Sequence, residues 1–509
     1  MSDKKYYITT PIYYVNDVPH IGHAYTTIAA DVLARFYRLY GYDVLFMTGT
    51  DEHGQKIERA AEKAGMTPQE FVNMNSQVFR DLDKHINSSS DMFMRTSSEE
   101  HKISAQALWN KLYDNGQIYE SKYCGWYSIR DEAFFAESEL VDGKAPTGAE
   151  VEWVEEPSYF FKLSQWQEPL LKYYQENPEF IGPDSRRNEV MSFVKSGLRD
   201  LSISRSTFKW GIPVPQNPEH VMYVWIEALS IYITALGHPN VDSDKFKQFW
   251  PTCVQLMGKD IIRFHGVYWP AFLMAAGYPL PKKEFAHGWW TIEGEKMSKS
   301  IGNVVDPIAL TNKYGVDPVR YFLMREVPFG KDGDFSIHSF INRVNSDLAN
   351  DLGNLSQRVL SFVYKNCEAK IPAHGIFTEA DNELLNMAKA LNKTIFDLME
   401  KQEISKICEA IWAVIGESNR YIDTQQPWSL RKTDQERMQT VLYVLMEALR
   451  YIAILTQPIM PDSATKILEQ LAIPFAQRVI DSIDENILKP ETVLPQPEGV
   501  FPRIQLECI

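Results

Sequence analysis

The chain opens, over residues 6–48, with the sequence YYITTPIYYVNDVPHIGHAYTTIAADVLARFYRLYGYDVLFMT. Residues 6–10 are predicted to form a short buried strand, because apolar and β-branched residues dominate them. A proline-containing turn leads into a predicted helix from about Ile21 to Tyr40, and a second strand follows at Asp43–Thr48. This order of elements predicts a parallel α/β sheet with right-handed crossovers, the start of a doubly wound, Rossmann-type domain.

Length and composition limit the class of protein. A chain of 509 residues is too long for one core and predicts two to four domains. With 44% hydrophobic and 23% charged residues, the composition is that of an ordinary soluble globular protein. No run of about 18 uncharged apolar residues is present, which disfavours a membrane span. Met1–Lys5 lead straight into the first strand without the features of a signal peptide, so we expect a cytoplasmic protein without a membrane partner.

The charge and the cysteines exclude further classes. A net charge of -15 argues against promiscuous binding of polyanions, although a local basic face can still attract RNA phosphates. The five cysteines form no Cys-x-x-Cys pair, so neither a disulfide framework nor a thiolate metal site is indicated. They are Cys124, Cys253, Cys367, Cys408 and Cys508.

The hydrophobic pattern divides the chain into five segments. Residues 1–116 are predicted to form the first half of the α/β domain, and 221–290 its second half, in which strand character returns. Between them, 117–220 have short aromatic segments and acidic joints, which indicate a small inserted domain. Residues 291–345 contain a Gly-bracketed lysine loop. From 346–509 apolar residues at spacings of three and four predict an all-α bundle of roughly five helices.

The first motif with chemical meaning is Pro19-His20-Ile21-Gly22-His23, at the turn between the first strand and its helix. Ligands of doubly wound sheets bind at the carboxyl ends of strands, and helix N-termini attract phosphate. Two imidazoles placed there can donate hydrogen bonds to phosphate oxygens, and their effect grows as charge develops in a transition state. Gly22 has no side chain, which lets a flat adenine approach the backbone.

The second motif is Lys296-Met297-Ser298-Lys299-Ser300, flanked by Gly294 and Gly302. Two lysines on such a loop can move over a triphosphate and neutralise its β- and γ-oxygens, and the loop can open when pyrophosphate leaves. Taken alone, either motif also fits an ordinary strand–helix turn or a solvated surface loop.

Together and in this order, the two motifs resemble the signature pair of class I aminoacyl-tRNA synthetases. The resemblance implies catalytic roles for His20, His23, Lys296 and Lys299 in activating an amino acid with Mg-ATP. It implies an ATP site built from His20, Gly22, His23, Lys259, Asp260, Lys296, Ser298 and Lys299.

Four further segments are similar to those of one family, the methionyl-tRNA synthetases, and this resemblance covers nearly the whole chain. The segments are Thr10-Pro11-Ile12-Tyr13-Tyr14, Gly49-Thr50-Asp51-Glu52-His53-Gly54, Tyr223-Val224-Trp225-Ile226-Glu227-Ala228-Leu229 and Gly258-Lys259-Asp260-Ile261-Ile262-Arg263-Phe264-His265. The resemblance implies that Asp51 holds the substrate ammonium. It implies a methionine side-chain pocket lined by Ile12, Tyr14, Trp225, Leu229, Tyr232, Ile261 and His265.

The implied pocket is chemically reasonable, because an ammonium needs a fixed carboxylate and a thioether packs well against aromatic rings. Taken singly, the same residues have ordinary interpretations. Trp225, Leu229, Tyr232 and Ile261 fit a core helix, and His265 fits a buried structural histidine. Asp51 fits a residue that caps the following helix.

The inserted segment departs from many relatives, which carry zinc knuckles with paired cysteines. Here Tyr127-Ser128-Ile129-Arg130-Asp131-Glu132 has serine and aspartate in their place, and the region near Lys144–Gly148 also lacks them. A closed structural zinc site needs four ligands, so we expect no zinc and no resident metal. The insertion is also too short for the large editing domain of the isoleucine and valine enzymes.

The helical segment carries the residues that, by resemblance, read a CAU anticodon. Asn350, Asn354 and Arg358 recur every four residues and are predicted to share one helix face. Trp428 follows Gln426-Pro427 at a helix break, where an indole can offer a stacking surface. Without the resemblance, a polar helix face and a half-buried tryptophan would explain them.

The sequence therefore predicts an α/β catalytic domain with an inserted connective domain, followed by an all-α anticodon-binding bundle. Residues 291–345 would include the lysine loop and a region that contacts the tRNA stem. The expected activity is methionine–tRNA ligation with ATP, L-methionine and tRNA(Met) as partners, in a monomer. The alternatives are a class I synthetase for another amino acid such as leucine or cysteine, a small-molecule nucleotidyltransferase, and a non-catalytic tRNA-binding protein.

Overall fold

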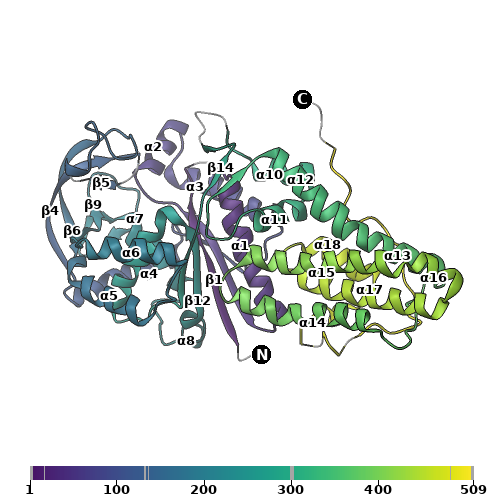
Figure 1. The fold of residues 1–509 in the computed structure, drawn as a ribbon. Helices are drawn as coiled ribbons and strands as arrows, with labels where there is room; N and C mark the ends of the chain where they lie inside the picture. Colours follow the sequence, from purple (N-terminus) through teal and green to yellow (C-terminus); the bar gives the residue numbers. More distant parts are fainter. Residues whose placement is uncertain are drawn as a thin grey trace.

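A computed structural model describes residues 4–16, 18–130, 133–135, 137–297, 303–481, 483–485 and 487–505. A parallel sheet lies at the centre of the molecule (Figure 1). The inserted domain lies on one side of this sheet and the helical bundle on the other, so the chain forms an elongated molecule with the sheet between two lobes.

The central sheet has the strand order β3-β2-β1-β12-β13-β7, and every neighbouring pair is parallel. The strands are β1 (Lys5–Tyr14), β2 (Asp43–Asp51), β3 (Met92–Arg95), β7 (Ile181–Gly182), β12 (Cys253–Gly258) and β13 (Lys283–His287). The chain builds outward from β1 in one direction and from β12 in the other. The predicted doubly wound topology is thereby confirmed, and its switch point lies between β1 and β12, where such folds bind ligands.

Strand β1 is longer than predicted, because it continues through Pro11 to Tyr14. Its register against β2 shifts between Thr9 and Ile12, and its pairing with β12 ends at Thr9. Proline has no N–H to donate, and a bulge is where a strand tolerates it. Beyond the irregularity, the end of β1 no longer pairs with β12 but resumes its ladder with β2 as far as Tyr14, just before the first motif.

Both faces of the sheet are covered. Helix α1 (Ile21–Leu39) packs on the face that carries Ile8 and Leu256. The opposite face carries Tyr7 and Met257, and it is covered by the helices α4 (Glu99–Asp114), α7 (Val224–Thr234) and α9 (Trp269–Ala276). Alternate strand residues thus enter two different cores, which is typical of a parallel sheet buried on both sides.

The stretch 117–220 forms two small antiparallel sheets with the strand orders β5-β4-β6-β8 and β10-β11-β9. Their strands are β4 (Ile118–Ser128), β5 (Ala133–Phe135), β6 (Glu152–Phe161), β8 (Leu201–Ser202), β9 (Ser204–Arg205), β10 (Pro213–Val214) and β11 (Asn217–Met222). The same stretch contains α5 (Gln167–Glu176), α6 (Asp184–Lys195) and β7. Because β7 pairs with β13, part of this stretch forms the edge of the central sheet.

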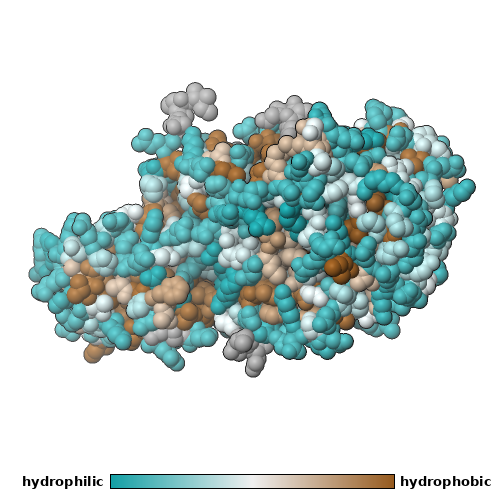
Figure 2. Space-filling view, turned by 180° about the vertical axis from the view of Figure 1, so that it is seen from behind, coloured by the Kyte–Doolittle hydropathy of each residue, from teal (hydrophilic) through white to brown (hydrophobic). Residues whose placement is uncertain are grey.

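The C-terminal lobe is helical from α12 (Ile337–Arg343) onward. It continues with the π-helical segment η6 (Val344–Gly353), α13 (Asn354–Asn366), α14 (Glu379–Met399), α15 (Ile404–Gln425), α16 (Pro427–Thr433), α17 (Gln435–Thr456) and α18 (Pro461–Gln470). Helix α17 is long and apolar enough to cross a membrane, but 94% of its most apolar window is buried inside the protein. That burial is the environment of the central helix of a bundle. On the face opposite to that of Figure 1, hydrophilic side chains predominate and hydrophobic ones form scattered groups (Figure 2).

A buried ion pair joins the α/β domain to the helical lobe. Arg320, in α11 (Val316–Arg325), donates to Asp31 of α1 over 2.6 Å, and neither side chain is exposed. The same guanidinium donates to the carbonyls of Pro458 and Ile459, between α17 and α18. The helix that starts at the first motif is therefore fixed against the bundle by one fully hydrogen-bonded arginine.

Candidate active site

The two histidines of the first motif close the N-terminus of α1 with their own side chains. The backbone N–H of Gly22 donates to Nδ1 of His20 over 3.0 Å, and the backbone N–H of His20 donates to Nδ1 of His23 over 3.0 Å. The rings lie 3.9 Å apart between centroids. This is a reciprocal capping box in which imidazoles take the places usual for Ser or Thr and Glu.

The cap also fixes where the ring protons lie. Each Nδ1 accepts a hydrogen bond, so in a neutral imidazole the proton resides on Nε2. Burial lowers the pKa of His20 against a smaller opposing effect of Asp260, and burial beside His20 lowers the pKa of His23 well below its usual range. Near pH 7 both rings are therefore neutral Nε2–H donors at a helix N-terminus, which suits the binding of phosphate.

The second motif approaches the first across the start of α1. The Cε atom of Met297 lies 3.9 Å from the position that a Cβ atom on Gly22 would take. The backbone N–H of Ile21 donates to the carbonyl of Val305 over 3.1 Å. Residues on both sides of 298–302 therefore lie close to the helix start. Lys296 belongs to the short strand β15 (Glu295–Lys296), whereas Ser298 and Lys299 lie outside the described residues.

Gly22 meets a steric requirement that the sequence did not indicate. A Cβ atom there would lie 2.8 Å from Cε1 and 3.0 Å from Nδ1 of His20. We expect Gly22→Ala to push the His20 ring off its cap and to slow ATP-dependent exchange of pyrophosphate by about tenfold, because small misplacements of positioned groups are costly. Thermal unfolding should change little, since alanine favours the helix. An unchanged exchange rate would contradict this role of the glycine.

Lys259 and Asp260 lie at the carboxyl end of β12, on the other side of the switch point. Nζ of Lys259 donates to Asp332 over 2.6 Å and lies 4.3 Å from the ring centroid of Trp289. Nε1 of Trp289 donates to Asp260 over 3.0 Å. The carboxylate of Asp260 acts electrostatically on His20, so the structure brings this predicted part of the ATP site close to the first motif.

Tyr232 and His265 form a buried polar pair. The Tyr232 hydroxyl lies 2.7 Å from Nε2 of His265, and Nδ1 of His265 lies 3.1 Å from the carbonyl oxygen of Ile261. A carbonyl can only accept, so Nδ1 carries the ring proton and Nε2 accepts from the tyrosine. Burial lowers the pKa of His265 to about 4, which keeps the imidazole neutral.

Most of the other residues predicted for the side-chain pocket gather on the same side of the sheet, whereas Tyr14 packs against a separate cluster that contains Tyr13 and Phe79. Trp225 stacks on Phe264 with 3.5 Å between ring centroids and an interplanar angle of 11°. Leu229 and Tyr232 are buried in the core against which Ile12, Trp225 and Ile261 pack. The spacing of these residues also fits a plain core helix. In the structure, however, a stacked indole and a tyrosine–histidine pair lie beside one another.

Asp51 is the last residue of β2 and pairs in register with Tyr14 of β1. It is 8% exposed. Its carboxylate raises the pKa of Tyr232, although burial, Glu284 and Cys253 have larger effects on that pKa. The next helix, α2 (Gln55–Ala64), has Gly54 at its N-cap and no side-chain capping bond. The alternative that Asp51 caps this helix is therefore wrong, and its carboxylate lies near the predicted pocket.

The neutral His265 predicts a sensitivity to acid. An unfolded histidine binds a proton below its ordinary pKa of 6.5, whereas folded His265 resists protonation down to about pH 4. Stability should consequently fall as the pH drops through this window, by up to about 1.4 kcal/mol per pH unit for one histidine. Denaturant titrations at several pH values would measure the slope. His265→Gln should flatten it, and an equal slope in the variant would contradict the assignment.

The structure also shows a buried contact between a histidine and a carboxyl group that the sequence reasoning did not single out. Nδ1 of His53 lies 2.7 Å from a carboxylate oxygen of Glu227, and the two side chains are 3% and 0% exposed. Both residues lie within segments quoted for the resemblance, which was the only available signal. The pair ties the loop after β2 to α7, the helix that carries Trp225 and Tyr232.

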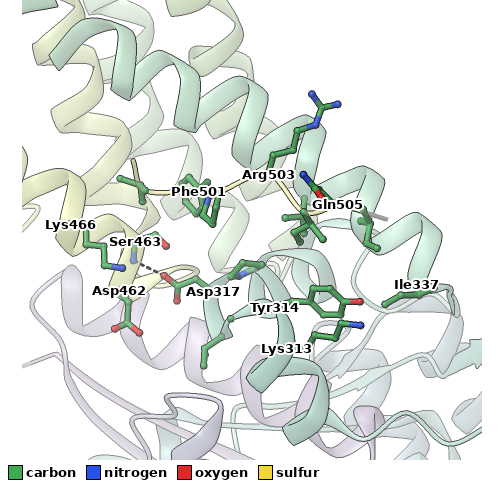
Figure 3. Close-up of a pocket in the computed structure, with 18 residues that line it drawn as sticks. Lys313, Tyr314, Asp317, Ile337, Asp462, Ser463, Lys466, Phe501, Arg503 and Gln505 are labelled. Atoms are coloured by element: carbon green, nitrogen blue, oxygen red, sulfur yellow. Dashed lines mark hydrogen bonds between the residues drawn. The ribbon is translucent and has the colours of Figure 1, made fainter. Parts of the chain in front are cut away.

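A cavity of about 790 Å³ lies away from these residues (Figure 3). It is enclosed by α10 (Pro307–Tyr314), the start of α11, α18 and the C-terminal residues 500–505. Asp317 lines it and accepts from the backbone N–H of Ser463 over 2.6 Å. None of the residues predicted for the ATP, methionine or anticodon sites lines this cavity.

Comparison with known proteins agrees with this geometry. The family model described as tRNA synthetases class I (M) matches residues 6–152 and 139–360. The model described as the anticodon binding domain of methionyl tRNA ligase matches residues 371–507. The methionine–tRNA ligase of Rickettsia felis is 56% identical in an alignment of 509 positions that covers 99% of this chain and 99% of the relative. The chain belongs to the methionyl-tRNA synthetases.

Other methionyl-tRNA synthetases are similar along the whole length. The methionine–tRNA ligase of Brucella suis is 54% identical over 508 residues, or 99% of this chain and 98% of the relative. The structure of the Mycobacterium tuberculosis methionyl-tRNA synthetase in complex with methionyl-adenylate matches with a TM-score of 0.96 and 51% identity, covering 98% of this chain and 100% of that chain.

The anticodon residues predicted for this methionyl-tRNA synthetase come from separate helices of the bundle (Figure 1). Asn354 and Arg358 lie on α13, but Asn350 lies in the π-helical segment η6. The three residues therefore do not lie on one regular α-helix, although their four-residue spacing predicts one. Arg358 donates to Asp423 over 2.6 Å and lies 5.6 Å from the ring centroid of Trp428. The indole is 41% exposed on α16, as an exposed stacking surface requires.

Among the described residues, no group of three or more His, Cys, Asp or Glu side chains is arranged to hold a metal ion. Asp131 and Glu132 of the knuckle-like stretch lie outside those residues, as does Cys508. The other four cysteines have free thiols, with Cys124 exposed and Cys253, Cys367 and Cys408 buried.

Proposed function

We propose that this methionyl-tRNA synthetase activates L-methionine with ATP and transfers it to a tRNA with a CAU anticodon. The observation that supports this most directly is the start of α1. Two neutral imidazoles offer Nε2–H donors there, and Met297 of the lysine motif lies beside them at the switch point of the sheet. This is where a doubly wound fold would bind a nucleotide.

In the first step, the carboxylate of methionine attacks the α-phosphorus of ATP. The bond between this phosphorus and the oxygen that bridges to the β-phosphate breaks, and pyrophosphate leaves. His20 and His23 donate hydrogen bonds to phosphate oxygens, and Lys296 and Lys299 neutralise charge on the leaving pyrophosphate. Gly22, Lys259, Asp260 and Ser298 complete the ATP site. The protein mainly orients the reactants, so no covalent enzyme intermediate is required.

Methionine would be held at both ends. The carboxylate of Asp51 pairs with the substrate ammonium, and the thioether packs among Trp225, Leu229 and the Tyr232–His265 pair, with Ile12, Tyr14 and Ile261 around them. The Tyr232 hydroxyl donates to His265, so its oxygen lone pairs remain the polar feature of the wall. A methylene more or less changes binding by only about 1–3 kcal/mol, so this polar pair would add selectivity against aliphatic side chains.

In the second step, a ribose hydroxyl of the 3′-terminal adenosine attacks the adenylate carbonyl and AMP leaves. Asn350, Asn354, Arg358 and Trp428 would read the anticodon, while the region 291–345 would contact the stem. Mg²⁺ would enter bound to the phosphates of ATP, because this ion prefers phosphate oxygens and water to a closed protein cage. We further propose that the enzyme acts as a cytoplasmic monomer.

The test is methionine-dependent exchange of labelled pyrophosphate by the purified protein, followed by charging of a CAU transcript. Methionine alone among the standard amino acids should support rapid exchange, and changing the anticodon of the transcript should abolish efficient charging. Exchange supported instead by leucine or cysteine would overturn the choice of amino acid. Exchange without charging of any transcript would overturn the transfer step.

A further inference from the structure

Three neighbouring strands of the central sheet place polar side chains in its core. Thr9 of β1 pairs in register with Gln255 of β12, which pairs with Glu284 of β13. Partners in register point to the same face of a sheet, so the three side chains form one row. Met47 of β2 and Ile181 of β7 flank this polar row at its two ends. All three polar residues are 0% exposed.

The polar row is not satisfied by protein groups. Oγ1 of Thr9, both amide atoms of Gln255 and both carboxyl oxygens of Glu284 are buried and have no protein hydrogen-bond partner within the described parts of the chain. Buried polar atoms are almost always hydrogen-bonded, and internal water supplies the partners that protein groups do not. Several such atoms side by side therefore indicate a built hydration site.

The row lies behind the residues proposed to recognise methionine. Tyr7, on the same face of β1 as Thr9, donates its hydroxyl to the carbonyl of Tyr232 over 2.9 Å. Among the titratable groups that raise the pKa of Tyr232, Glu284 has the largest effect after burial. At the end of the row, Ile181 lies 3.4 Å from the position of a Cβ atom on Gly266, the residue next to His265.

We propose that Thr9, Gln255 and Glu284 bind internal water molecules that position the Tyr232–His265 pair, and that Glu284 takes part as an uncharged acid. This inference rests on the proposed function, because it gives the row a role only through methionine recognition. Glu284 is a positioning residue here and does not touch the substrate.

The surroundings of Glu284 favour the uncharged form. The titratable groups that interact with it are Tyr232 of α7, Cys253 of β12 and Tyr174 of α5, all neutral near pH 7. Among the ion pairs of the described residues, no cation is paired with Glu284. Burial raises the pKa of this carboxyl well above its usual range. A protonated carboxyl offers both a donor and an acceptor, as the threonine and glutamine beside it do.

Two substitutions separate positioning from mere packing. Glu284→Gln keeps the shape and neutrality of the acid, so its KM values in pyrophosphate exchange should stay within about twofold of the natural protein. Glu284→Leu removes the polar groups at similar volume and should raise the KM for methionine by about tenfold, with the KM for ATP unchanged. Met47→Leu, at the apolar end of the row, is the matched control and should change neither value.

Folded Glu284→Leu protein with an unaltered KM for methionine would overturn the proposal, provided that the natural protein catalyses methionine-dependent exchange. Failure of the natural protein to do so would instead overturn the proposed function. If Glu284→Leu does not fold, a high-resolution crystal structure of the natural protein decides. Water molecules within hydrogen-bonding distance of Glu284 and Gln255 would support the proposal, whereas a dry site or a bound metal ion there would overturn it.

Discussion

Replacing His23 by asparagine should slow methionine-dependent pyrophosphate exchange by about 100- to 1,000-fold, the usual cost of losing one positioned donor to developing charge. The geometry makes this a specific test. Nδ1 of His23 accepts from the backbone N–H of His20, and the amide oxygen of asparagine can take over this bond. The Nε2–H donor has no counterpart in asparagine. The variant thus keeps the start of α1 and loses only the group proposed to face phosphate.

The complementary variant is His23→Gln, whose longer side chain can place an amide N–H near the position of Nε2. It should retain more of the exchange rate than asparagine, and both variants should stay within about 1 kcal/mol of the natural protein in stability, because the amide oxygen of either side chain can accept from the backbone N–H of His20. The free energy of unfolding and the exchange rate should be measured for both variants. If asparagine keeps the exchange rate of the natural protein, His23 acts by capping the helix and the proposed phosphate contact is wrong.

The order of the main elements could be predicted because hydrophobic pattern and turn chemistry agree over long stretches. The sequence Thr67-Pro68-Gln69-Glu70 predicts a capping box, and it opens α3 (Pro68–His85), with the threonine oxygen accepting from the backbone N–H of Glu70. The polar residues of the stretch 368–380 predict a break between helices, and this stretch separates α13 from α14. In both cases the signal lies within a few residues, so no tertiary information was needed.

Details that depend on distant residues could not be predicted. The sequence predicts a helix near Asp260–Ala276, but the π-helical segment η5 (Phe264–Tyr268), which carries His265, interrupts it. Such bulges follow from packing at functional sites and leave little local trace. The row of Thr9, Gln255 and Glu284 exists only because three strands pair in one register. Neither the strand order nor that register can be read from the separate segments.

The candidate site shows the same division. Resemblance supplied the residues of the ATP and methionine sites, but it could not supply their hydrogen bonds. The ring tautomer of His20 follows from the backbone N–H of Gly22, and that of His265 follows from the carbonyl of Ile261. Those bonds decide whether each imidazole donates or accepts. The chemistry of the site is therefore set by local backbone geometry that the motif letters do not specify.

Replacing Trp428 by alanine should lower kcat/KM for tRNA charging by about 100-fold, because stacking of a base on an aromatic ring contributes about 1–3 kcal/mol. The indole is 41% exposed, and its neighbour Arg358 is held by Asp423 over 2.6 Å. Stacking surface and guanidinium thus come from two helices that are fixed before tRNA binds. Methionine-dependent exchange should be unchanged, since α16 contributes nothing to the residues around His20.

Two controls make the loss specific to the anticodon. Trp428→Phe keeps an aromatic face at the same place and should stay within a few-fold of the natural protein in charging, because stacking tolerates a change of ring. A minihelix that consists only of the acceptor stem should be charged equally, though slowly, by the natural protein and by Trp428→Ala, since it has no anticodon to lose. If alanine impaired the minihelix as strongly as the full CAU transcript, Trp428 would be acting through the fold of the bundle. That result would contradict the proposed role of Trp428 in reading the anticodon, but it would leave the proposed ATP site unaffected.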